Sequence, residues 1–91
     1  MKQMKGKIVL ITGGASGIGK IMAGLFLERK ANVIIWDMNS PKIDETILEL
    51  QSKGTIVGFV VDVSDVHQIQ ETALKVKQEI GVVDVLINNA G

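Results

Sequence analysis

The residues with the clearest chemical potential form a glycine-rich segment near the start of the chain. Residues 12–19 read Thr-Gly-Gly-Ala-Ser-Gly-Ile-Gly, directly after the apolar run Ile8–Ile11 and at the start of a segment with helical periodicity. Glycines here let the chain turn sharply, let the backbone approach a ligand, and let the helix pack closely on the strand. The free N–H groups and positive dipole end of the helix suit a pyrophosphate. The alternative is a glycine-rich turn that binds nothing.

The order of residues differs from that of a nucleoside triphosphate loop. Gly19 is followed by Lys20 and Ile21, whereas a P-loop ends in Lys followed by Ser or Thr, whose hydroxyl binds Mg²⁺. The chain has no Cys and one His, His67, and a single His does not form a metal site. We therefore expect no metal, and we expect His67 on a solvated helix face.

A carboxylate follows at the distance that a dinucleotide site requires. Asp37 ends the apolar run that contains Trp36, eighteen residues after Gly19. At that strand end a carboxylate accepts hydrogen bonds from the hydroxyls of the adenosine ribose and repels a 2′-phosphate. No basic residue stands at Met38 or Asn39, and Ser16 rather than a basic residue precedes Gly17. These features favour NAD over NADP; the alternative is a solvated acid at a strand end.

A second acid ends the third apolar run. The Asp62 carboxylate and the Val63 N–H could hydrogen-bond an adenine ring at the same edge of a sheet. The alternative is that Asp62, Ser64 and Asp65 only cap the helix that follows.

The elements that must position these residues alternate along the chain. Four β-branched apolar runs suit parallel strands buried on both faces; they are residues 8–11, 33–36, 56–61 and 85–87. Three stretches between them have helical periodicity, and their predicted buried stripes are Ile18, Ile21, Met22, Leu25 and Phe26; Ile43, Ile47 and Leu50; and Val66, Ile69, Ala73, Val76 and Ile80. This β-α-β-α-β-α-β order predicts an α/β, Rossmann-like parallel sheet with strand order 3-2-1-4, whose ligand lies at the switch point. We expect residues 1–91 to be the N-terminal dinucleotide-binding part of a single domain.

Composition excludes several classes of partner. The chain has 91 residues, zero formal net charge and 46% hydrophobic residues. Such a chain is globular, and it offers no electrostatic attraction to nucleic acid or an anionic membrane. No apolar run approaches membrane-spanning length. The absence of Cys fits a reducing compartment, and we expect a cytoplasmic protein.

Taken together, these motifs resemble the short-chain dehydrogenase/reductase family. The resemblance rests on Thr12-Gly13-x-x-x-Gly17-x-Gly19, on Asp37, on Asp62-Val63 and on the terminal Asn88-Asn89-Ala90-Gly91. It covers the whole chain but only the N-terminal part of the family's domain. It implies an oxidoreductase that transfers hydride between NAD and a small alcohol or carbonyl substrate. The cofactor-binding residues that it implies are Gly13, Ser16, Gly17, Ile18, Gly19, Asp37, Met38, Asp62, Val63, Asn89, Ala90 and Gly91. It also implies that the Asn88 and Asn89 amides tie the sheet together.

The catalytic residues of that family have no counterpart in this chain. The family uses a Tyr-x-x-x-Lys pair and a Ser beyond the Asn-Asn-Ala-Gly motif, whereas this sequence has no Tyr. We therefore expect a fragment of a truncated doubly wound domain, without catalytic residues and inactive alone. Its fourth strand would be an unpaired apolar edge, which predicts self-association, and we expect a homo-oligomer.

Two other functions fit parts of the pattern. The lack of Tyr also suits a dinucleotide-binding module without catalysis, such as a redox sensor. A methyltransferase could bind an adenosyl group through a glycine loop and a strand-end acid, although the glycine spacing and the Asn-Asn-Ala-Gly motif argue against it. The sequence does not identify the substrate.

Overall fold

Strands and helices alternate throughout residues 4–90, the part of the chain that the computed structural model describes. The elements are β1 (Ile8–Thr12), α1 (Gly17–Glu28), β2 (Asn32–Asp37), α2 (Ser40–Leu50), a 3-10 turn (Gln51–Lys53), β3 (Ile56–Val60), α3 (Val66–Glu79) and β4 (Val85–Asn88). The strands form one parallel sheet with the order β3-β2-β1-β4. The predicted Rossmann-like topology is therefore confirmed.

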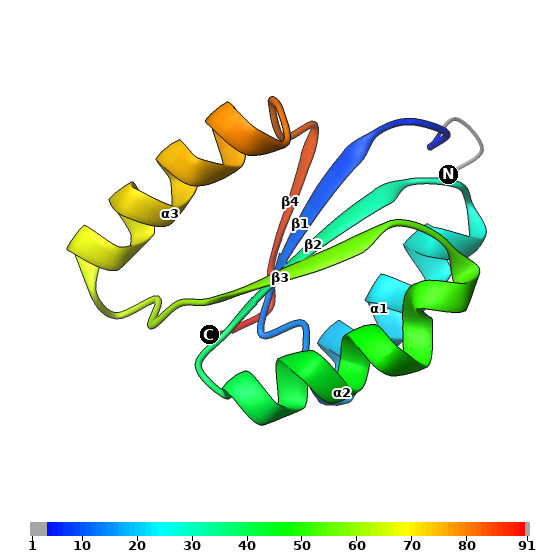
Figure 1. Cartoon of the computed structure of the whole chain (residues 1–91), viewed down its shortest axis with the longest axis horizontal. Coiled ribbons are helices and arrows are strands. Elements are labelled where there is room, and N and C mark those ends of the chain that lie inside the picture. Colours follow the sequence, from blue (N-terminus) through cyan, green and yellow to red (C-terminus); the bar gives the residue numbers. More distant parts are fainter. Residues whose placement is uncertain (1–3, 91) are drawn as a thin grey trace.

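The helices lie on opposite faces of the sheet, with α1 and α2 on one side and α3 on the other (Figure 1). Successive residues of β1 point alternately to these faces. Val9 and Ile11 belong to the core beneath α1 and α2, whereas Leu10 packs with Trp36 and Val76 beneath α3. Burial on both faces explains why the apolar runs are continuous.

The buried face of α1 differs from the predicted stripe. Phe26 is buried as expected and Met22 packs on the core, but Ile18, Ile21 and Leu25 are 68%, 63% and 49% exposed. The other buried residues of α1 are Gly19, Ala23 and Leu27. At the start of the buried face the residue is small because a Cβ at Gly19 would collide with the Gly13 carbonyl, just after β1. The bulky residues at the predicted positions therefore point outward.

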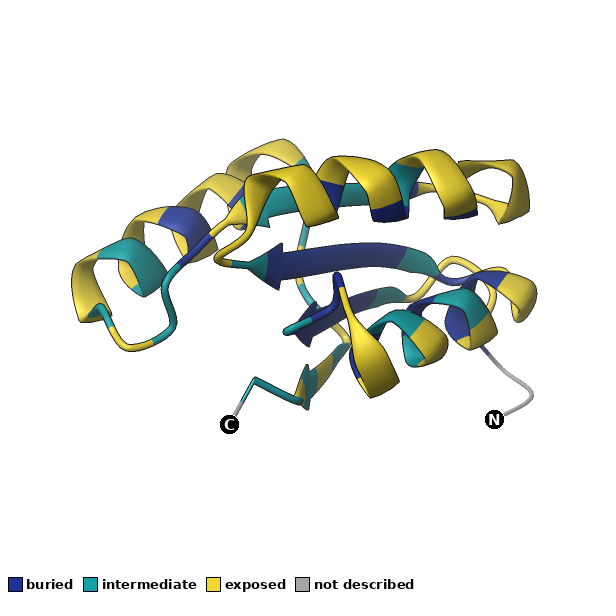
Figure 2. Ribbon diagram, turned by 90° about the horizontal axis from the view of Figure 1, so that it is seen from below, coloured by how far each residue is buried: buried dark blue, intermediate teal, exposed yellow. Residues whose placement is uncertain are grey.

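The other two stripes are confirmed to different degrees. On α2, Ile43 and Leu50 are buried and Ile47 packs against them. On α3, Val76 is buried and Ile69 and Ile80 pack on the core, but Val66 and Ala73 are exposed. Figure 2 shows the contrast between the buried centre of the sheet and its exposed margins. Because α3 is the single helix on its face in residues 4–90, only part of its stripe reaches the strands.

Candidate functional site

The predicted site residues gather at the carboxyl edge of the sheet. The loops after β1, β2, β3 and β4 all leave this edge because the strands are parallel (Figure 1). β1 and β4 are neighbours, and β2 lies on the other side of β1. The direction of the sheet order reverses at β1, which is the switch point where doubly wound folds bind ligands.

The glycine loop, residues 13–19, has a backbone shape that favours glycine at two positions. Gly13 and Gly17 have φ of +65° and +55°, in the left-handed region that favours glycine. A Cβ on Gly14 would lie 2.5 Å from the Ile35 side chain. A Cβ on Gly19 would collide with the Gly13 carbonyl and lie 2.7 Å from Asn89 Nδ2. Gly14 and Gly19 therefore let the loop pack closely against Ile35 and Asn89 and against its own backbone, in agreement with the glycine roles of a dinucleotide-binding turn.

The beginning of α1 is open to an anion. Ser16, Gly17 and Ile18 are exposed, and the Ser16 side chain makes no capping hydrogen bond. The first helical bond runs from Lys20 N to Ser16 O, at 3.3 Å, so the N–H groups of the preceding turn have no partner within the helix. No acidic residue stands in the first turn. Such a helix start can receive a phosphate oxygen.

The earlier N–H groups of the loop are already used. Gly13 N and Gly14 N donate to the Trp36 carbonyl, at 2.7 and 3.4 Å, and Ala15 N donates to Asp37 Oδ2 at 3.2 Å. Only the N–H groups from Ser16 onward are left for an anion. The N–H groups of Gly13 and Gly14 are therefore not available to a ligand, and what these residues contribute is the absence of a side chain.

Asp37 connects the glycine loop to the end of β2. Besides Ala15 N, its carboxylate accepts from Asn39 N at 3.1 Å through Oδ1. The side chain is half-buried, while Met38 beside it is 66% exposed. Two backbone donors thus hold an ionisable group at the strand end, next to the open helix start. Each carboxylate oxygen keeps accepting capacity for a ligand hydroxyl.

Of the two acids after β3, Asp65 caps the following helix and Asp62 does not. Asp65 is the N-cap of α3 and accepts from His67 N at 2.9 Å and Gln68 N at 3.3 Å. Asp62 instead accepts from the Ser64 hydroxyl at 2.6 Å and from Ser64 N at 2.9 Å. These two bonds, the hydroxyl first, hold the pKa of Asp62 below its ordinary value. Asp62 is therefore an ionised strand-end group outside the cap, and Val63 beside it is half-buried.

The end of β4 is fastened to β1 and to the glycine loop. Asn89 Nδ2 donates to the Gly13 carbonyl at 3.1 Å, and Asn88 Oδ1 accepts from the Thr12 hydroxyl at 3.1 Å. The two amides thus join β4 to β1 and its loop, as the resemblance implied. Ala90 is half-buried beside them, and Gly91 lies outside the described residues.

Two hydroxyl side chains were missed as site residues. Thr12 Oγ1 accepts from the N–H groups of Asn89 and Ala90, at 3.0 and 3.1 Å. Thr46 on α2 donates to the Ala15 carbonyl at 3.2 Å. Thr12 was visible as the first residue of the glycine motif. Thr46 was visible as the polar member of the Ile43, Ile47 and Leu50 stripe.

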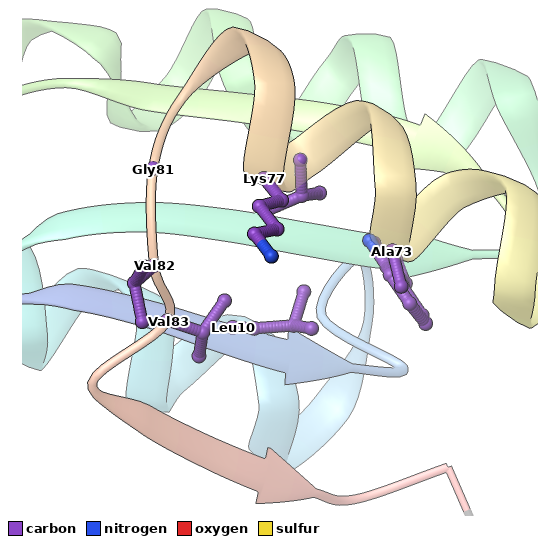
Figure 3. A pocket seen from close by; sticks show the side chains of 8 residues that line it. Leu10, Ala73, Lys77, Gly81, Val82 and Val83 are labelled. Atoms are coloured by element: carbon purple, nitrogen blue, oxygen red, sulfur yellow. The ribbon is translucent and has the colours of Figure 1, made fainter.

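Two hollows lie on the α3 side of the sheet. The larger, about 780 Å³, opens at the carboxyl edge and is lined by Thr12, Val63, Ser64, Asn88 and Ala90 among others. The smaller, about 290 Å³, is lined by Lys77 on α3 and, opposite it, by Leu10 and Val83 (Figure 3). Trp36 lines both hollows and is 5% exposed. It is therefore a core residue on the α3 side of the sheet.

Residues 4–90 contain no cluster of three or more His, Cys, Asp or Glu side chains that could hold a metal ion. In the same residues, no helix is both long and apolar enough to cross a membrane.

Comparisons with known proteins agree on one family. The profile of the short chain dehydrogenase family matches residues 7–91. Human estradiol 17-beta-dehydrogenase 11 is 44% identical over 91 residues, which are 99% of this chain and 30% of that protein. NAD⁺-bound xylitol dehydrogenase superposes with a TM-score of 0.94 at 28% identity, over 99% of this chain and 35% of the other. L-sorbose reductase from Gluconobacter frateurii, complexed with NADPH, gives 0.93 at 29% identity, over 100% of this chain and 36% of the other. The chain therefore spans about a third of the length of such proteins.

Proposed function

The chain belongs to the short-chain dehydrogenase family, and we propose that it forms the NAD-binding, N-terminal part of a single Rossmann-fold domain in an oxidoreductase. The reaction would be hydride transfer between nicotinamide and a small alcohol or carbonyl substrate. The bound cofactor would supply the hydride chemistry, and the protein would supply binding and orientation. The observation that carries the proposal is the open start of α1 beside the Asp37 carboxylate.

Residues from the loops after the four strands would each bind a different part of the cofactor. The backbone N–H groups of Ser16–Gly19 would hold the pyrophosphate, and the exposed Ile18 would border it. Asp37 would accept from the adenosine ribose, next to Met38. At the other strand ends, Asp62 and Val63 would hold the adenine, and Asn89, Ala90 and Gly91 would line the groove.

We also propose that the cofactor is NAD rather than NADP. Relatives of similar structure are complexed with NAD⁺ in one case and NADPH in another. In this chain the group beside the ribose site is the Asp37 carboxylate, and its neighbours Met38, Asn39 and Ser16 carry no positive charge. A 2′-phosphate there would meet the like charge of the Asp37 carboxylate.

The proton donor of the reaction would come from outside these residues. The chain has no Tyr, and Ser16 and Ser64 lie in the two loops that we propose to hold the cofactor. We propose that the 91 residues alone bind NAD without turning over a substrate. A dinucleotide-binding module without catalysis stays open as the second candidate.

Isothermal titration calorimetry on the full-length protein tests the proposal. We expect NAD to bind at least about tenfold more tightly than NADP, since a like-charge contact at this half-buried carboxylate costs about a kilocalorie or more. Tighter binding of S-adenosylmethionine than of NAD would instead favour a methyltransferase. NAD binding with no oxidation of any alcohol tried would favour the sensor.

The cytoplasmic location and the homo-oligomeric state stay predictions from the sequence. Cell fractionation tests the first, and size-exclusion chromatography with light scattering tests the second. β4 lies at the edge of the described sheet, and its exposed Leu86 is one residue that self-association would cover.

A further inference from the structure

One buried hydroxyl lies next to the glycine loop and has no place in the function proposed above. Thr46, in the middle of α2, is 1% exposed. It stands between Ile43 and Leu50 on the face that packs on the core. A hydroxyl in such a place is unfavourable unless it makes a hydrogen bond. Its position in the apolar stripe therefore calls for a partner.

The partner is not the one that a helix would offer. A threonine inside a helix usually satisfies its hydroxyl by donating to the carbonyl one turn earlier. Thr46 donates instead to the Ala15 carbonyl, at 3.2 Å and 31 positions away in the sequence. The bond therefore connects α2 to the glycine loop, and it contributes nothing to the helix itself.

The same residue of the loop is held from a second side. Ala15 is 4% exposed, and its N–H donates to Asp37 Oδ2 at 3.2 Å. The two polar backbone groups of Ala15 are thus bound by side chains from two elements, the end of β2 and the middle of α2.

The two bonds to Ala15 lie between the two glycines of the loop that have left-handed backbone conformations. Gly13 and Gly17 both have positive φ, and glycine has the widest choice of backbone conformations. Ala15 lies midway between them, and Ser16, the N-cap of α1, follows it directly. Fixing Ala15 therefore fixes the direction in which the N–H groups of the next residues point.

We propose that Thr46 is a positioning residue, whose hydroxyl sets the orientation of the glycine loop for the diphosphate of the cofactor. The inference rests on the proposed function of that loop. Thr46 touches no ligand; it acts through the Ala15 carbonyl.

The test compares Thr46→Val, Thr46→Ser and Thr72→Val in the full-length protein, by calorimetric titration with ADP, with adenosine and with NAD. Valine keeps the shape and removes the donor, and serine keeps the donor. Thr72 is the matched control because it is also a buried threonine, 8% exposed, but lies on α3. Thermal unfolding of each variant is recorded in parallel.

We expect Thr46→Val to raise the Kd for ADP and NAD about tenfold, and that for adenosine about threefold or less. Thr46→Ser and Thr72→Val should stay within about twofold of the unaltered protein. Should Thr46→Val not fold, Thr46→Ala, which places no methyl group against the carbonyl, gives the same comparison.

Equal losses for ADP and adenosine, or unchanged affinity at a lowered Tm, would overturn the positioning role. The unaltered protein separates this inference from the one on which it rests. If it binds neither NAD nor NADP, both fail; if it binds NAD and Thr46→Val binds it equally well, only the role of Thr46 fails.

Discussion

The loops after β1 and β3 both carry predicted cofactor residues, but they are held in different ways. The glycine loop is fixed by groups distant in sequence, namely Asp37, Thr46 and Asn89. In the loop at residues 61–65, Val61 N donates to the distant Asp37 carbonyl at 2.9 Å. Residues 62–65 are instead held by bonds among themselves and by Gln68, whose Oε1 accepts from Asp62 N at 2.9 Å. The first loop therefore depends on the tertiary fold, whereas residues 62–65 of the second form a local structure. Changes in the first should affect binding far more than changes in the second.

The largest effect is expected from Gly19→Ala. The new Cβ would collide with the Gly13 carbonyl, a backbone atom that cannot rotate away. The loop would have to open, and we expect NAD affinity to fall by about a hundredfold or more, since such clashes cost a few kilocalories. Calorimetric titration measures it.

Gly24→Ala is the matched control in the same helix. There the added Cβ would meet only Leu50 Cδ2, at 3.7 Å. Alanine in a helix interior is favoured over glycine by about 0.5–1 kcal/mol, so this variant should bind NAD normally and unfold at a slightly higher temperature. Equal NAD affinity for Gly19→Ala and Gly24→Ala would contradict the claim that the packing of Gly19 against the Gly13 carbonyl is needed for binding.

Asp37→Asn should have the next largest effect. It removes the charge beside the ribose site and weakens the bond to Ala15 N, so we expect NAD affinity to fall about tenfold to thirtyfold. NADP affinity should fall less, because the like charge is gone. The NAD to NADP affinity ratio is the readout.

Asp44→Asn serves as the control, because Asp44 is exposed on the outer side of α2. If the two variants have the same ratio of NAD to NADP affinity, Asp37 has no role in selecting the cofactor.

Thr12→Val should reduce stability more than it alters the choice of cofactor. The N–H groups of Asn89 and Ala90 would lose their shared acceptor, and two unpaired donors cost about 2 kcal/mol in the free energy of unfolding. Urea denaturation measures the loss. Thr12→Ser, which retains the oxygen, should recover most of it; an equally unstable serine variant would contradict this explanation.

The smallest effect is expected in the locally held loop. Removing the hydroxyl in Ser64→Ala should raise the pKa of Asp62 toward its ordinary value, because the bond from Ser64 Oγ is the main cause of the lowered pKa. A lowered pKa in the folded state contributes stability above the unfolded pKa and loses it as pH falls through the folded value. A carboxyl-carbon NMR titration checks this. An unchanged pKa would show that the Ser64 backbone bond is sufficient.

The same contrast explains what the sequence could predict. The four apolar runs and the helical stretches between them are local patterns, and they were sufficient for the strand order. The α1 prediction was right for Met22 and Phe26 but wrong for Ile18, Ile21 and Leu25, because the close packing that buries Gly19 against the Gly13 carbonyl exists only in the folded chain. Asp37 follows from its place at a strand end. Its bond to Ala15, and that of Thr46, join residues 22 and 31 positions apart, and no short pattern marks such pairs.

The most direct test of the whole account is an amide NMR titration of the full-length protein with NAD. The account predicts that the largest shift changes fall on the N–H groups of residues 16–19, with smaller changes at Asp37 and at residues 62–63. Shifts concentrated on the α3 side, around Lys77 and Val83, with residues 16–19 unmoved would contradict it.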